Sequence, residues 1–126
     1  PAAIELSEKL NNKYLTDNWS YKGVICDVNS LDFSNLQFET GGELINTELD
    51  IIINTSCEHM TTEWFDTVSD NTLIVMQTNN SKEFEGHINT VSSQEEMCEL
   101  YPMTSDYCGE LQTPVYTRYM QIGYKR

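Results

Sequence analysis

The chain contains 126 residues, of which 39% are hydrophobic and 21% charged, a composition typical of one soluble globular domain. Acidic residues number 20 and basic residues 7, so the net charge is −13, which argues against nucleic acid and against an anionic membrane as partners. The longest apolar run, Ile51-Ile52-Ile53, is far shorter than the roughly 18 residues of a membrane span. Four widely spaced cysteines without a CxxC motif are expected to be free thiols in the cytoplasm.

The first third of the chain is predicted to begin with a helix and continue into a strand. Residues 1–16 carry one apolar stripe at helical spacing, formed by Ala3, Leu6, Leu10 and Tyr14. Residues 21–26 contain a short apolar run without alternation, which is typical of a strand buried on both faces of a parallel sheet, and this strand would end at Asp27. A polar connection over residues 27–48 follows, with a turn at Gly41-Gly42.

The middle of the chain repeats the order of strand, helix and strand. Residues 49–54 are apolar on both faces and indicate a second buried strand, which ends at Asn54. Residues 72–77 indicate a third, which ends at Gln77. Between them, residues 59–69 are expected to be helical because apolar side chains recur at every fourth position, at Met60, Trp64 and Val68.

The last third is predicted to contain a capped helix and a hairpin. Ser92 and Ser93 each stand three residues before a glutamate, a capping-box pattern that begins a helix, and Pro102 ends it. Residues 107–111 and 115–125 are expected to form two antiparallel strands. In the second strand, period-two alternation predicts one face directed to the core, with Tyr116, Arg118, Met120, Ile122 and Tyr124.

These elements predict a single α/β domain over residues 1–126, incomplete at its N-terminus. Strands near residues 22–27, 49–54 and 72–77 alternate with helices, which favours a mainly parallel sheet flanked by helices. The C-terminal antiparallel hairpin is expected to pair beside the strand at 72–77.

A binding site is expected where the predicted parallel strands end. Ligands of open parallel sheets bind outside the carboxyl ends of the strands, so Asp27, Asn54 and Gln77 would lie along one edge. Amide, hydroxyl and carboxylate groups at such an edge would orient a small polar molecule.

Residues 54–59 form the densest group of reactive side chains. Cys57 with His59 would suit a thiol nucleophile and its base, although neighbours in sequence seldom adopt that geometry. Cys57, His59 and His87 would be metal ligands, but no ligand-pair spacing supports them and no metal is expected. We favour Glu58 or His59 as a general acid or base, or as a group that orients the substrate.

The sequence resembles the carboxyl-terminal two thirds of a class I, Rossmann-like, S-adenosylmethionine-dependent methyltransferase. The opening PAAIELSEKL is similar to the helix after the family's second strand, GVICDV to its third strand, LDIIINTS to its fourth and NTLIVMQ to its fifth. Residues 105–125 look like its sixth and seventh strands, the antiparallel hairpin. The family's first two strands and its glycine-rich cofactor loop have no counterpart among these residues.

The resemblance implies a truncated Rossmann-like methyltransferase fold with S-adenosylmethionine as cofactor. It implies cofactor contacts at Asp27, Val28, Asn54 and Thr55, with Asp27 facing the adenine amine, and catalytic roles for Asn54, Glu58 and His59. The methyl acceptor would be a small molecule or a protein. The alternative is a non-catalytic α/β module that acts by association. Because the family's central strands have no counterpart here, we expect the chain to form a homo-oligomer through its exposed strand edges.

Overall fold

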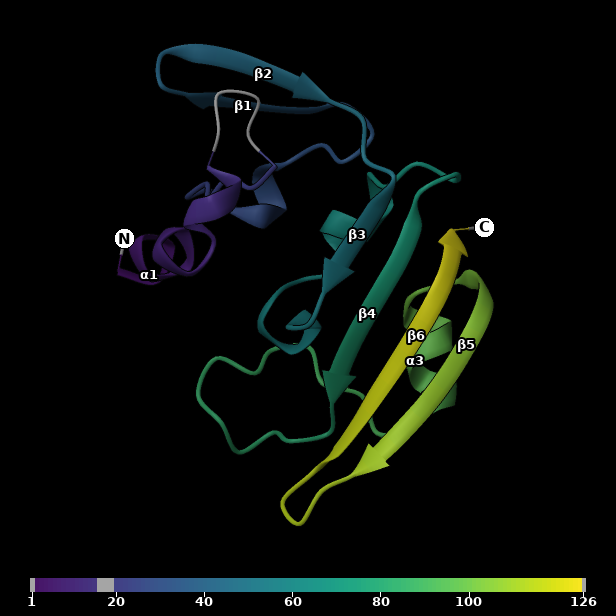
Figure 1. The fold of residues 1–126 in the computed structure, drawn as a ribbon. Helices are drawn as coiled ribbons and strands as arrows, with labels where there is room; N and C mark the ends of the chain where they lie inside the picture. The colour runs from purple at the N-terminus through teal and green to yellow at the C-terminus, as the bar shows by residue number, and fades with distance from the viewer. Residues whose placement is uncertain (1, 16–19, 126) are drawn as a thin grey trace.

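The structure is a computed structural model that describes residues 2–15 and 20–125 (Figure 1). Its helices are α1 (Ala2–Leu10), α2 (Glu63–Asp66) and α3 (Gln94–Leu100), with short 3-10 helices η1 (Asn12–Tyr14), η2 (Val28–Ser30) and η3 (Cys57–His59). Its strands are β1 (Leu36–Thr40), β2 (Glu43–Thr47), β3 (Ile51–Asn54), β4 (Leu73–Asn79), β5 (Met103–Gln112) and β6 (Thr117–Lys125).

The main sheet has four strands in the order β3-β4-β6-β5. Strands β3 and β4 are parallel, whereas β6 is antiparallel to both of its neighbours, β4 and β5. The prediction of a mainly parallel sheet flanked by helices is therefore wrong: the sheet is mixed, and most of its pairings are antiparallel. The predicted position of the C-terminal hairpin beside β4 is confirmed, and this hairpin supplies both antiparallel pairings.

The predicted strand at residues 21–26 does not form, which removes a parallel strand from the sheet. This segment packs against α1 instead: the Tyr21 hydroxyl donates a hydrogen bond to Ser7 Oγ at 2.6 Å. A Cβ on Gly23 would lie 2.8 Å from Ile4 Cγ2, so this backbone is held close to the helix. A short apolar run becomes a strand only when another strand pairs with it. Here Ile25 remains exposed.

The long connection that the sequence left unassigned contains a small separate sheet. Strands β1 and β2 form an antiparallel hairpin, with Leu36 opposite Thr47 and Thr40 opposite Glu43. Gly41 and Gly42, the predicted turn, both have positive φ, a conformation that a side chain with a Cβ rarely adopts. This hairpin leads directly into β3 (Figure 1).

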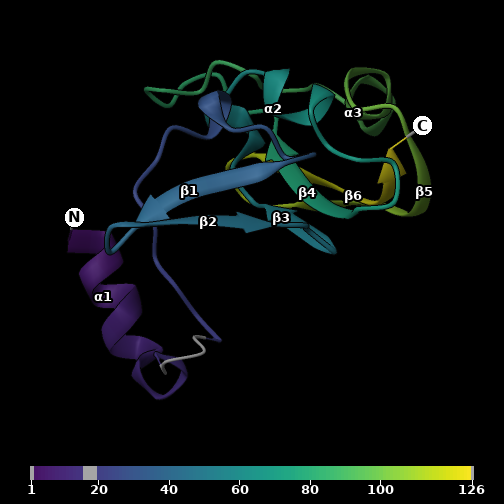
Figure 2. The ribbon, with the colours of Figure 1, turned by 90° about the horizontal axis from the view of Figure 1, so that it is seen from above.

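The main sheet is covered on one face. Helices α2 and α3 lie on that face, and the opposite face carries no helix in the described part of the chain (Figure 2). Inward-facing Ile52, Ile74 and Met76 join the core, where Trp64, Phe65 and Tyr101 pack at ring-centroid distances of 5.4–6.0 Å. One-sided covering is typical of sheets with antiparallel strands, and it explains why β3 is not buried on both faces.

The face of β6 that contacts the core is opposite to the predicted one. Tyr119, Gln121 and Gly123 are buried, whereas Met120 and Ile122 point to the uncovered face. That uncovered face, which we call the open face, is mainly apolar. Residues directly opposite each other across the strands form two of its rows: Ile51–Leu73–Tyr124 and Ile53–Val75–Ile122–Tyr107.

The predicted helices form with changed lengths. The predicted helix at 1–16 is helical over Ala2–Leu10, but no residue of α1 is buried, so its apolar stripe is uncovered. Of the predicted helix at 59–69 only Glu63–Asp66 is α-helical, although Trp64 and Val68 are buried as its spacing predicts. No helix of the described residues has the length and apolarity needed to cross a membrane.

Candidate functional site

A pocket of about 310 Å³ lies at the carboxyl end of β3. We call it the β3 pocket, and its lining consists of Val28, Phe33, Ile52, Ile53, Asn54, Thr55, Ser56, Met60 and Trp64. Three of the four predicted cofactor residues, Val28, Asn54 and Thr55, therefore line the same pocket, although η2 and β3 are far apart in sequence. Apolar walls with a few polar groups at one end are typical of small-molecule sites.

Asn54 shapes the polar end of the β3 pocket. Its side-chain oxygen accepts a hydrogen bond from the Ser56 backbone N–H at 3.0 Å, and its amide nitrogen lies 3.1 Å from Met60 Sδ. These contacts hold the turn that leads from β3 into η3. Asn54 is thus a positioning residue for the rim in this structure, and Thr55 beside it is exposed.

Asp27 lies outside the β3 pocket. It is exposed and caps η2, where its carboxylate accepts a hydrogen bond from the Asn29 N–H at 3.0 Å. Because residues 21–26 are not a strand, Asp27 does not end a sheet strand as predicted. Asn54 and Gln77 do lie near the same end of the parallel pair β3 and β4, but Gln77 is on the open face, within β4 rather than at its end.

A second group of functional side chains lies at η3, where His87 from the connection after β4 meets Glu58 and His59. Glu58, His59 and His87 each offer a ligand atom, and these atoms lie within 4.8 Å of one another. We call these residues the Glu–His–His cluster. The two imidazole rings are 4.6 Å apart between centroids and nearly perpendicular, at 78°. Glu58 is 6% exposed, His59 is exposed and His87 is partly buried, so the cluster opens to solvent on the histidine side.

Backbone hydrogen bonds bring the cluster together from segments 28 positions apart. The N–H groups of Ile88 and Asn89 both donate to the carbonyl oxygen of Glu58, at 2.8 and 3.1 Å. These two hydrogen bonds hold the connection after β4 against η3, so that His87 lies beside His59. Sequence spacing gave no sign of the contact, and His87 was expected at a functional site only as a metal ligand.

Asn79 and Ser81 complete the network behind the cluster. The side-chain amide of Asn79 donates to Glu58 Oε1 at 2.8 Å, and its oxygen accepts from the Ser81 N–H at 2.9 Å. Both residues are buried. No sequence motif marked either residue: Asn79 lies just after a predicted strand, and Ser81 contacts His87 through its backbone carbonyl rather than its side chain.

Cys57 is unsuited to act as a nucleophile. Its side chain is fully buried, and burial raises the pKa of its thiol to about 12, with the neighbouring Glu58 carboxylate adding to the rise. A catalytic cysteine needs a lowered pKa and solvent access. The thiol alternative therefore has no support in the geometry, and all four cysteines are free, as predicted.

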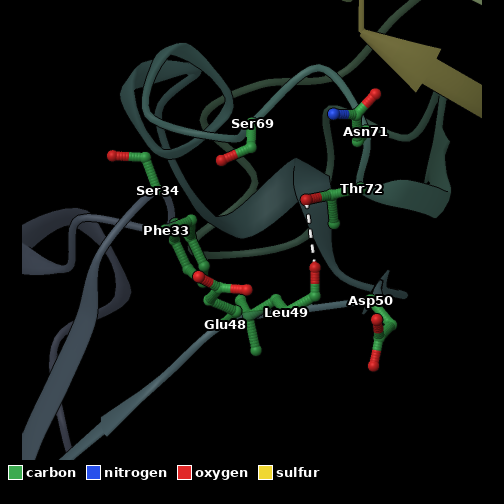
Figure 3. A pocket seen from close by; sticks show the side chains of 8 residues that line it. All are labelled: Phe33, Ser34, Glu48, Leu49, Asp50, Ser69, Asn71 and Thr72. Carbon is green, nitrogen blue, oxygen red and sulfur yellow. Dashed lines mark hydrogen bonds between the residues drawn. The ribbon is translucent and has the colours of Figure 1, made fainter.

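Another pocket, of about 320 Å³, lies at the amino ends of β3 and β4 (Figure 3). Figure 3 shows Glu48 and Asp50 on one side and Ser69 and Asn71 on the other, with the Thr72 hydroxyl donating to the Leu49 carbonyl at 3.2 Å. None of the predicted site residues lines it. The β3 pocket and the Glu–His–His cluster contain predicted site residues and remain the better candidates.

Comparisons with protein-family models, curated proteins and solved structures find no match for this chain. Its function must therefore be argued from the site.

Proposed function

We propose that this chain binds S-adenosylmethionine at the β3 pocket and takes part in methyl transfer to a small molecule or a protein. The observation that carries the proposal is the convergence of Val28, Asn54 and Thr55 on one pocket, because the methyltransferase resemblance assigns these residues to the cofactor.

The chemistry of the pocket suits a nucleoside. Val28 and Met60 offer apolar surface for a purine ring, and Thr55 and Ser56 offer hydroxyl groups for its polar edge or the ribose. Methyl transfer from a sulfonium requires mainly alignment of the acceptor with the methyl carbon, so a strong catalytic motif is not needed. His59 is the exposed candidate for orienting or deprotonating the acceptor, because Glu58 is buried behind it.

Charge and cysteine content favour a class of methyl acceptor and a cellular compartment. A net charge of −13 disfavours a nucleic-acid acceptor. Four free cysteines favour the cytoplasm, where thiols stay reduced.

Titration calorimetry with S-adenosylhomocysteine tests the proposal. We expect one binding event for the parent chain and at least a tenfold weaker one for Val28→Asp, which puts a charge into the apolar wall. The matched control is Val115→Asp, because Val115 is exposed and distant in sequence from the pocket. Absence of binding at millimolar ligand, or equal binding by both variants, would contradict the proposal.

The open face favours a second candidate function, self-association. Ile51, Ile53, Tyr107 and Tyr124 are all exposed on it, and contiguous apolar surfaces of this kind mark interaction sites. Sedimentation velocity at micromolar concentration should then show a dimer or larger species, which Ile53→Lys would dissociate. A single 14.5 kDa species in the parent would rule this function out.

A further inference from the structure

We propose that the Glu–His–His cluster is a binding site for a divalent first-row transition-metal ion, with Zn²⁺ as the probe. The ligands are a carboxylate oxygen of Glu58 and one ring nitrogen each of His59 and His87, already within 4.8 Å of one another. Two imidazoles and a carboxylate are a donor set of catalytic zinc sites. This inference does not depend on the proposed methyl transfer.

A backbone carbonyl fixes one ring nitrogen of each histidine. His59 Nδ1 is 3.1 Å from the Gly86 carbonyl oxygen, and His87 Nδ1 is 2.6 Å from the Ser81 carbonyl oxygen. A carbonyl only accepts hydrogen bonds, so in each case Nδ1 carries the proton and donates it. The neutral rings therefore present the Nε2 lone pair. Metal-bound histidines are fixed by the same kind of contact.

Glu58 supplies an unpartnered oxygen at the same place. The residue is 6% exposed; Oε1 accepts from Asn79, whereas Oε2 is buried without a hydrogen-bond partner. Buried polar groups almost always have partners, so an orphaned carboxylate oxygen next to two imidazoles requires an explanation. A cation at the cluster provides one, since it would pair with Oε2 and leave the Asn79 contact intact.

A chain of hydrogen bonds connects two of the three ligands. Asn79 links Glu58 to the Ser81 N–H, and the Ser81 carbonyl in turn holds His87. A tetrahedral ion with ligand bonds of about 2.1 Å has its ligands about 3.4 Å apart. Closing the cluster onto an ion thus needs only small shifts of the side chains. Three protein ligands would leave one position for water or a substrate oxygen.

Cobalt titration gives the direct test. After dialysis against a chelator, Co²⁺ should bind at one equivalent and produce visible d–d bands, and Zn²⁺, whose d¹⁰ shell carries no ligand-field penalty in a tetrahedral site, should displace it. The Cys98 and Cys108 sulfurs, 4.0 Å apart, are a competing site. Binding there would add a sulfur-to-cobalt band in the near ultraviolet, which the Glu–His–His cluster cannot produce.

Variants locate the ion. We expect His87→Ala and Glu58→Gln each to weaken Co²⁺ binding at least tenfold. Glu85→Gln is the matched control, because it removes the same charge from an exposed position on the same connection and should bind like the parent. Circular dichroism identifies folded variants, and His87→Ala decides alone if Glu58→Gln does not fold. Binding below 0.1 equivalent (about a tenth of the sites) at saturating Co²⁺, a thiolate band at full occupancy, or unchanged binding by His87→Ala would overturn the proposal.

Discussion

Ile52 and Ile53 are neighbours on β3 whose side chains point to opposite faces of the sheet. Ile52 is 9% exposed within the core, and Ile53 is 69% exposed on the open face. Replacing each by alanine removes the same atoms, once from the buried face of the sheet and once from its exposed face. The pair therefore measures how one-sided the sheet is in solution.

The expected difference follows from burial. An Ile→Ala change removes about three methylene equivalents, worth about 0.8 kcal/mol each when fully buried, or about 2.4 kcal/mol in total. Scaled by the buried fraction, and with a cavity contribution added, Ile52→Ala should lower the free energy of unfolding by about 3 kcal/mol. The same scaling gives about 0.7 kcal/mol for Ile53→Ala, which leaves little cavity because solvent fills the space.

Urea unfolding followed by tryptophan fluorescence, to which the buried Trp64 contributes, provides the measurement, with free energies from linear extrapolation. The slope m should be the same for the parent and both variants. If Ile53→Ala destabilised as much as Ile52→Ala, the open face would be covered in solution and the one-sided sheet would be refuted. Repeating the series at two protein concentrations identifies a second copy as the cover, because the midpoints would then depend on concentration.

Three further changes test other parts of the molecule. The folded pKa of Cys57, about 12, lies above its ordinary value of 9.0, so the unfolded chain loses this proton first as pH rises. Stability should therefore fall above pH 9, by about 4 kcal/mol near pH 12, and Cys57→Ala should flatten a pH series of urea midpoints. Ser93→Ala removes the side chain that accepts from the Glu96 N–H and should lower the free energy of unfolding by about 1 kcal/mol. Gly123→Ala would press a Cβ into the Thr104 carbonyl oxygen and should destabilise by about 2 kcal/mol, and an unchanged melting temperature would contradict this packing.

Local chemistry was enough to predict several elements. The start of α3 depends on residues that are close in sequence: Ser93 Oγ accepts from the Glu96 N–H as expected, and the Glu96 carboxylate accepts from the Ser92 N–H. Strands β3 and β4 were predicted correctly because each contains a continuous apolar run. The Gly41-Gly42 turn likewise needed only backbone freedom at two positions.

Features that depend on distant partners were not predictable in this way. Alternation in β6 correctly indicated two unlike faces, but it could not say that Tyr119 and Gln121 would face the helices. Residues 21–26 had the composition of a strand and no strand to pair with. His59 and His87 meet only because the connection after β4 bonds to the Glu58 carbonyl, a contact between backbone groups that leaves no mark on side-chain identity.

The open face also affects the solubility of the protein at high concentration. Near neutral pH each copy carries a net charge of −13, and this mutual repulsion opposes face-to-face contact. Acidification toward the isoelectric point of about 4.2 removes the repulsion while the apolar rows remain. High salt acts in the same direction, because it shortens the range of the repulsion to a few ångströms and strengthens apolar contacts. Concentrated solutions should therefore stay clear at neutral pH and low ionic strength and turn cloudy as either condition is changed.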